Sequence, residues 1–226
     1  TNLGANLMMS QEEASDALLE TMEMMRGAGR LVGMTDDQIV KSGQTMLKSF
    51  NDLAMETGRN RDEIRKATAD IMKRPDIDTV LRSLDDASKE KLGKTFAEVA
   101  AKMGQAAGPV ADAIAKINLG GLGAVDEQMR VAMNVIPGLT AAFEDAAKGV
   151  PGAIDRMTSI MDSPDTRQRM RALSVQLPDV AKVLQEMSAG SRQAAEAQAR
   201  LNAMSPAQRA AYEESIKEQQ RQQAVM

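Results

Sequence analysis

Pairs of closely spaced carboxylates are the residues in this sequence that could most directly do chemistry. The pairs are Asp36 with Asp37, Asp76 with Asp78, Asp85 with Asp86, and Glu213 with Glu214. Two carboxylates can hydrolyse a glycosidic bond without histidine when an apolar pocket raises the pKa of one of them. Here every pair lies at an expected helix start or on a polar helix face, where a carboxylate favours the helix dipole or meets water. We interpret the pairs as capping or solvated groups, and a carboxylate-only glycan-cleaving enzyme is the enzymatic alternative.

The absence of histidine and cysteine narrows the chemistry further. Without cysteine the chain has no disulfide framework and no thiolate site. Without histidine it lacks the usual proton shuttle at neutral pH and the commonest zinc ligand, which excludes Ser-His-Asp hydrolases and most zinc enzymes. A calcium loop needs more acids than the segment from Asp76 to Asp78 supplies. We therefore predict a non-enzymatic protein with no catalytic residue, no cofactor and no metal ligand.

Two glycine clusters, Gly27 to Gly33 and Asn118 to Gly123, resemble phosphate-binding loops only in their glycine content. A dinucleotide or Walker loop follows a strand, and the Walker type also needs Gly-Lys-Ser/Thr. The sequence offers neither feature around these clusters. We predict that both are turns or helix ends.

The densest group of basic residues lies between positions 59 and 74. Its members are Arg59, Arg61, Arg65, Lys66, Lys73 and Arg74. Acidic residues are interspersed among them, and the net charge of the whole chain is −4. Nucleic-acid-binding surfaces usually carry a larger positive excess or stacking aromatics. We interpret this segment as a solvated, salt-bridged helix face, with weak contact to DNA as the alternative.

The chain reads as a series of short amphipathic helices with clear start signals. A Ser, Thr or Asn followed three residues later by Glu or Gln, or directly by Pro, is typical of a helix N-terminus. The predicted caps are Ser10, Thr35, Asn60, Ser163 and Ser205, and Asp76 is predicted to cap a short helix through Val80 to Leu84. A Met-Ser/Thr-x-x-Glu/Gln pattern recurs at three of these starts, which we interpret as one physical solution used three times. No segment alternates at period two, so the predicted fold class is all-α, a bundle-like domain of short helices.

Apolar residues at helical spacing predict the core, with Ile39, Phe50, Ile64 and Phe96 among its members. The chain has 18 methionines, three phenylalanines, one tyrosine and no tryptophan. Methionine is an adaptable filler, so we expect a pliable core of low stability. An exposed Met-rich face that binds a partner is the alternative use of these residues.

Composition divides the chain into three regions. Residues 1–103 form an N-terminal helical region, and residues 104–190 form a region rich in Ala, Gly and Pro that is expected to pack on it as short helices. Residues 191–226 are polar, have strong helix propensity and predict a projecting helix. The longest uncharged run, Val131 to Phe143, is too short to span a bilayer, so no stable transmembrane segment is expected. The chain starts without methionine and stops in an expected helix, which suggests a piece of a longer polypeptide.

The segment "GRLVGMTDDQIVKSGQTMLKSFNDLAMETGRNRDEIRKA", residues 29–67, resembles helical segments of tail tape-measure and related virion structural proteins of tailed bacteriophages. The matching elements are "GR-L-x-G-M-[ST]" and "TG-x-x-RDEIR", and the similarity covers about a fifth of the chain. The resemblance implies a long helical protein that is held inside the tail, assembles in several copies, sets tail length and leaves through the tube. The glycines and prolines of this chain preclude one continuous helix, so we expect a folded helical domain at one end of such a protein.

The resemblance leads to the expected function: a non-enzymatic structural virion protein, part of a tape-measure-like polypeptide. Its expected partners are other tail or virion proteins and copies of itself. Its expected location is the virion, in the tail interior or at a tail end, and the host cytoplasm during assembly. The alternatives are an internal or ejected virion protein stored near the packaged DNA, and a cellular all-α adaptor with a Met-rich binding groove.

Overall fold

The fold is all-helical, as the sequence predicts. A computed structural model describes residues 11–27, 29, 31, 33–176, 178–205, 207, 208 and 211. These residues form eleven α-helices and two short 3-10 helices, with no strand among them. The helices are α2 (Gln11–Gly27), α3 (Asp36–Thr57), α4 (Arg61–Met72), α5 (Pro75–Ser83), α6 (Asp86–Lys102), η1 (Gly104–Ala106), α7 (Ala107–Gly120), η2 (Leu122–Ala124), α8 (Glu127–Val135), α9 (Leu139–Ala147), α10 (Ala153–Asp162), α11 (Pro164–Gln176) and α12 (Pro178–Ala203).

Four of the five predicted Ser, Thr and Asn caps lie among the described residues, and all four are confirmed. Thr35 and Gln38 form a capping box, in which the Thr35 hydroxyl accepts from the Gln38 N–H and the Gln38 side chain accepts from the Thr35 N–H. The Asn60 side chain accepts from the Asp62 N–H at 2.7 Å, and the Ser163 hydroxyl accepts from the Thr166 N–H at 3.2 Å. Ser205 makes a reciprocal pair of hydrogen bonds with Gln208, between each residue's N–H and the other's side chain. Ser10 lies outside the described residues.

The capping role predicted for Asp76 is wrong. Helix α5 begins one residue earlier, at Pro75, with Arg74 in the N-cap position and no side-chain cap. Proline favours the first helical position because its φ suits a helix and it has no N–H to satisfy there. Asp76 therefore lies inside the first turn, where its charge favours the helix dipole without capping the end.

The cap of α3 offers a direct test of this local reasoning. We expect Thr35→Ala to lower the free energy of unfolding by about 1 kcal/mol, because the Gln38 N–H loses the hydroxyl that accepts its hydrogen bond. Urea denaturation followed by circular dichroism measures the loss. Thr79→Ala is a matched control, since this exposed threonine bonds only to the Pro75 carbonyl within its own helix. An equal loss in both variants would contradict the capping role.

One continuous hydrophobic core joins helices from α2 to α12. Phe50, Ile64 and Phe96 are fully buried within it, which confirms their prediction, whereas Ile39 is partly buried and packs against its edge. The described methionines are all buried or partly buried. Eleven are buried: Met24, Met25, Met46, Met72, Met103, Met129, Met133, Met157, Met161, Met170 and Met187. These methionines therefore fill the core.

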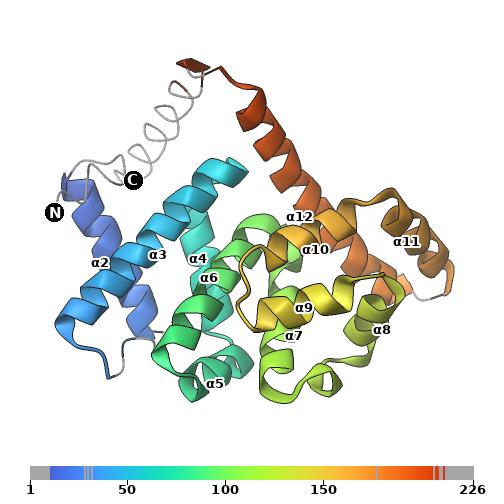
Figure 1. Cartoon of the computed structure of the whole chain (residues 1–226), viewed down its shortest axis with the longest axis horizontal. Helices are drawn as coiled ribbons and strands as arrows, with labels where there is room; N and C mark the ends of the chain where they lie inside the picture. Colours follow the sequence, from blue (N-terminus) through green and yellow to red (C-terminus); the bar gives the residue numbers. More distant parts are fainter. Residues whose placement is uncertain are drawn as a thin grey trace.

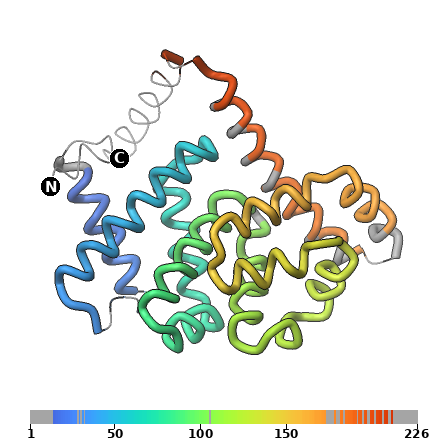
Figure 2. Tube along the Cα trace, viewed as in Figure 1, coloured from blue at the N-terminus to red at the C-terminus, as the bar shows by residue number. Residues whose placement is uncertain are grey.

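The helices succeed one another across the molecule, and α12 returns over them (Figure 1). Helix α3 lies between α2 and α6, α4 packs on α6, and α7 packs on α5 and α9. Helix α12 contacts α11, α10, α8, η1 and α3 in turn and then extends beyond them (Figure 2). The compositional boundary at residues 190 and 191 falls inside α12, so one helix carries both the buried residue Met187 and the exposed, polar end. Within the described residues, no helix has the length and hydropathy needed to cross a membrane.

Candidate functional site, a charged groove between α3 and α6

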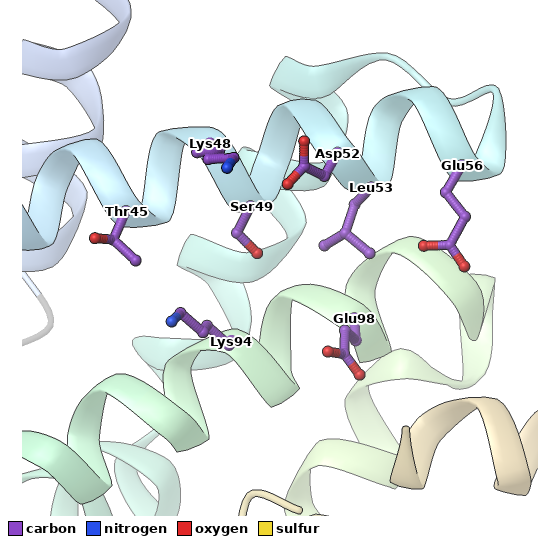
Figure 3. A pocket seen from close by; sticks show the side chains of 8 residues that line it. All are labelled: Thr45, Lys48, Ser49, Asp52, Leu53, Glu56, Lys94 and Glu98. Carbon is purple, nitrogen blue, oxygen red and sulfur yellow. The ribbon is translucent and has the colours of Figure 1, made fainter. Parts of the chain in front are cut away.

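A groove of about 440 Å³ runs between α3 and α6 (Figure 3). Its lining side chains recur every three or four residues along α3 and face two residues one turn apart on α6. The α3 residues are Thr45, Lys48, Ser49, Asp52, Leu53 and Glu56, and the α6 residues are Lys94 and Glu98. The two lysines lie toward one end and the carboxylates toward the other (Figure 3). The groove therefore presents a separated pattern of charge.

An ion cluster around a buried ammonium lies at the acidic end of the groove. The Lys102 ammonium, at the end of α6, bonds to the Glu56 carboxylate of α3 at 2.6 Å and to the Asp155 carboxylate of α10 at 2.5 Å. The Lys102 side chain is 5% exposed, whereas those of Glu56 and Asp155 are 41% and 59% exposed. One buried ammonium thus joins three helices through carboxylates that still contact water.

The charges of the cluster hold Lys102 protonated. Burial lowers the pKa of Lys102, but its hydrogen bonds and charge interactions with Asp155 and Glu56 exceed this effect and raise the pKa above 10.5. A lysine whose pKa is raised in the folded chain contributes stability below its unfolded pKa and loses it as the pH rises through the folded value. The contribution of Lys102 is therefore present at neutral pH and is lost only in alkali.

The charge of Glu98, unlike that of Lys102, opposes folding. Burial raises the pKa of Glu98; Lys102 lowers it, and the charges of Asp155 and Glu56 raise it further. A carboxyl whose pKa is higher in the folded chain opposes folding when it is ionised. Its unfavourable contribution therefore disappears as the pH falls from neutral toward the ordinary value of 4.5.

The raised pKa of Glu98 predicts how a neutral side chain at this position would change the stability. We expect Glu98→Gln to be more stable than the native chain at pH 7, because glutamine fills the same space without a charge. The difference should shrink as the pH falls and vanish near pH 4.5. Thermal unfolding followed by circular dichroism across this range measures it. A variant less stable than the native chain at pH 7 would show that the Glu98 charge supports the fold.

The predicted basic segment is used largely within the chain. Arg59 donates to the Ala100 and Ala101 carbonyls at 2.8 and 3.1 Å, and so satisfies the C-terminal end of α6. Arg65 pairs with Glu20 at 2.8 Å, and Arg74 pairs with Asp112 at 2.9 Å. The remaining members lie as follows: Arg61 is buried beside Asp62, and Lys66 and Lys73 are exposed. The predicted salt bridges are confirmed for the Arg65 and Arg74 pairs, but the prediction of a solvated face is wrong for Arg61 and Arg65, whose side chains are largely buried.

The glycine clusters and carboxylate pairs lie where local rules predict. Gly29 and Gly33 have positive φ in the turn after α2, and Gly121 does so after α7. Asp36 with Asp37 and Asp76 with Asp78 occupy the first turns of α3 and α5. Asp85 caps α6 and is followed by Asp86 in the first turn; the hydrogen bond from the Ser88 N–H is the main cause that lowers the pKa of Asp85. Glu213 and Glu214 lie outside the described residues.

The groove and its ion cluster place charged side chains between helices. Among the described residues, no three potential ligands of the His, Cys, Asp or Glu type come together as a metal site. No family model matches the chain, and no curated protein or solved structure shows significant similarity to it.

The sequence did not single out Lys102, Glu56 or Asp155 as members of a cluster. The available signal was a lysine at the edge of the apolar stripe of α6.

Proposed function

We propose that this chain is a helical segment of a tape-measure-like structural protein in a bacteriophage tail, and that it acts by packing rather than by catalysis. The observation that carries the proposal is the resemblance of residues 29–67 to such proteins. In this chain the resembling segment includes α3 and the first part of α4. The two helices are separated by Gly58, which adopts a left-handed conformation, and Asn60, which starts the next helix.

The composition of the core supports the same proposal. A protein that travels through a narrow tube has to unfold at low cost. The chain has no disulfide, only three phenylalanines and many buried methionines, which fill space without rigid shape. We expect the thermal midpoint of the isolated chain to lie within or below the mesophile range of about 45–65 °C. A midpoint well above this range counts against passage through a tube.

The adaptor alternative receives less support. A Met-rich binding groove needs methionine side chains on the surface. The described methionines are buried or partly buried, and the groove between α3 and α6 is lined by charged and hydroxyl side chains with one leucine. The exposed end of α12 is a polar surface, which suits contact with other virion proteins.

The test is the intact mass and location of the natural polypeptide. We would purify particles of the phage that encodes the chain, separate tails from heads, and identify the polypeptide in each fraction by mass spectrometry. The expected result is a tail protein several times larger than this chain. A mature protein that ends near Thr1 and Met226, or one found with the DNA-filled heads, would overturn the proposal.

A further inference from the structure

The groove between α3 and α6 contains charges that the described part of the chain leaves without partners. Lys48 and Asp52 on α3 and Glu98 on α6 line the groove, and among the described residues none of the three side chains forms a hydrogen bond or an ion pair. Burial is the main cause that raises the pKa of Asp52 and of Glu98. The groove therefore offers one unpaired ammonium and two unpaired carboxylates to a partner.

These unpaired charges have a fixed order along the groove. Lys48 and Asp52 are four positions apart on α3, which places them on one helix face about 6 Å apart along the axis. Glu98 lies across from them on α6, toward the acidic end (Figure 3). The lining residues of α3, from Thr45 to Glu56, cover about 17 Å of that helix. A complementary partner is a short helix with a carboxylate near Lys48 and a cation one turn further along.

The C-terminal part of α12, residues 191–203, carries this pattern. Glu196 and Arg200 are exposed, lie four positions apart, and form no ion pair with any described residue. Ala195, Ala199 and Ala203 are also exposed, and their small side chains allow another helix to approach closely. This part of α12 extends beyond the other labelled helices for about 20 Å (Figure 1), which is enough to fill the groove.

One orientation pairs all of these charges. If Glu196 lies opposite Lys48, a helix that runs in the same direction as α3 places Arg200 beside Asp52 and Glu98. A helix that runs in the opposite direction carries Arg200 away from both carboxylates. The spacing of charges therefore selects the parallel arrangement.

The helix that fills the groove has to come from another molecule. Helix α12 is continuous from Pro178 to Ala203, and its first part is fixed by buried residues that include Leu184 and Met187. It leaves the groove of its own chain open, with Glu196 and Arg200 exposed. A second copy of the chain supplies the same helix end without bending α12.

We propose that the groove between α3 and α6 binds the C-terminal part of α12 from a second copy of this chain, with Glu196 beside Lys48 and Arg200 between Asp52 and Glu98. Each copy has one groove and one such helix end, so the contact either closes a two-fold dimer or continues from copy to copy. An interface of this size belongs to the weak class. The inference concerns the isolated chain and does not depend on the proposed virion role.

Sedimentation equilibrium of the full chain tests the proposal. We expect reversible self-association at chain concentrations up to about 1 mM, weakened by about 0.5 M salt because exposed charges are screened. Lys48→Glu with Asp52→Lys reverses the groove, and Glu196→Lys with Arg200→Glu reverses the helix end. Each pair of substitutions should weaken association about tenfold, because attractions become repulsions. A chain that carries all four should associate again.

The control for these variants is a charge reversal away from the groove. Asp165→Lys with Arg169→Glu reverses an exposed ion pair within α11 and should associate like the native chain. Circular dichroism of every variant should match the native helix content, since the reversed side chains are exposed.

The absence of cysteine allows a second, direct test by disulfide trapping. Ser49→Cys places a thiol in the groove, and Ala199→Cys places one on the exposed end of α12. When the two single variants are mixed and oxidised, mass spectrometry should find more of the mixed disulfide than random pairing gives. Ser159→Cys, at an exposed position of α10, replaces Ala199→Cys in the control and should give only random pairing.

Three results would overturn the proposal. The first is a native chain that stays monomeric up to about 1 mM. The second is self-association that neither pair of charge reversals weakens, which would place the contact between copies elsewhere. The third is a chain with all four substitutions that associates no better than the chains with two, because the charges would then not face one another.

Discussion

Gly190→Ala should lower the free energy of unfolding by about 3 kcal/mol or prevent folding altogether. Gly190 lies in α12 where this helix crosses the junction of α6 and η1. A Cβ at this position would meet the Met103 backbone, 2.5 Å from its carbonyl oxygen and 2.9 Å from its Cα. Backbone atoms of a buried junction cannot rotate away as a side-chain tip can, so the two helices would have to separate.

Two other glycines provide a graded comparison for this prediction. Gly43 on α3 lies against Met22 and Leu18, and an added Cβ would contact only their flexible side-chain atoms, at 2.8 and 2.9 Å. Gly43→Ala should therefore cost less, about 1 kcal/mol. Gly123 has open space around it and no positive φ, so Gly123→Ala should leave stability within about 0.5 kcal/mol of the native value.

Urea denaturation followed by circular dichroism compares the three variants under one condition. The expected order of destabilisation is Gly190→Ala, then Gly43→Ala, then Gly123→Ala. A Gly190→Ala variant as stable as Gly123→Ala would mean that α12 can shift on η1 without loss, and the close crossing would have no role in holding the helix.

The second large effect is expected when Lys102 keeps its charge but loses the two carboxylates of its ion pairs. At pH 7, the double variant Glu56→Gln with Asp155→Asn should be less stable than the native chain by about 3 kcal/mol. Its amides can still accept hydrogen bonds, but they do not neutralise an ammonium whose side chain is 5% exposed. Of the carboxylates named above, Glu98 alone then still acts on the ammonium, which no longer has an ion pair.

Lys102→Met should be much closer to the native chain, within about 1 kcal/mol, although it also removes both ion pairs. Methionine places a flexible apolar chain in the same buried space, and the two carboxylates already contact water. Chemical denaturation of both variants at pH 7 tests this asymmetry. Equal losses would indicate that the ion pairs themselves, rather than desolvation of the ammonium, determine the stability of this contact between α3, α6 and α10.

Local features of the fold were predictable because their causes lie within a few residues. Thr35 with Gln38, Asn60, Ser163 and Ser205 start helices through bonds that span two or three positions. The error at Asp76 also has a local cause, since Pro75 takes the first helical position and Arg74 becomes the cap. The α-class and the core role of Phe50, Ile64 and Phe96 followed from periodicity.

The groove and its cluster were not predictable, because their partners are brought together by tertiary packing. Nothing near Lys102 in sequence indicates that Glu56 and Asp155 will meet it. Gly190 is similar: within "MSAGSRQ" a glycine reads only as a weak point of a helix, and its contact with Met103 depends on how α12 returns over η1. A single sequence specifies such contacts but does not display them.

The course of α12 also determines how the chain would respond to a mechanical load. Its first part is held by α8, α10 and α11, and beyond the crossing at Gly190 the helix continues for about 20 Å. The residues of this stretch whose burial the structure describes are exposed. A force that pulls on the C-terminal part of α12 would act on the Gly190–Met103 contact before it acts on the core around Phe96. Unfolding from that end would peel α12 away from η1 and α3 first, so the domain yields stepwise from one side.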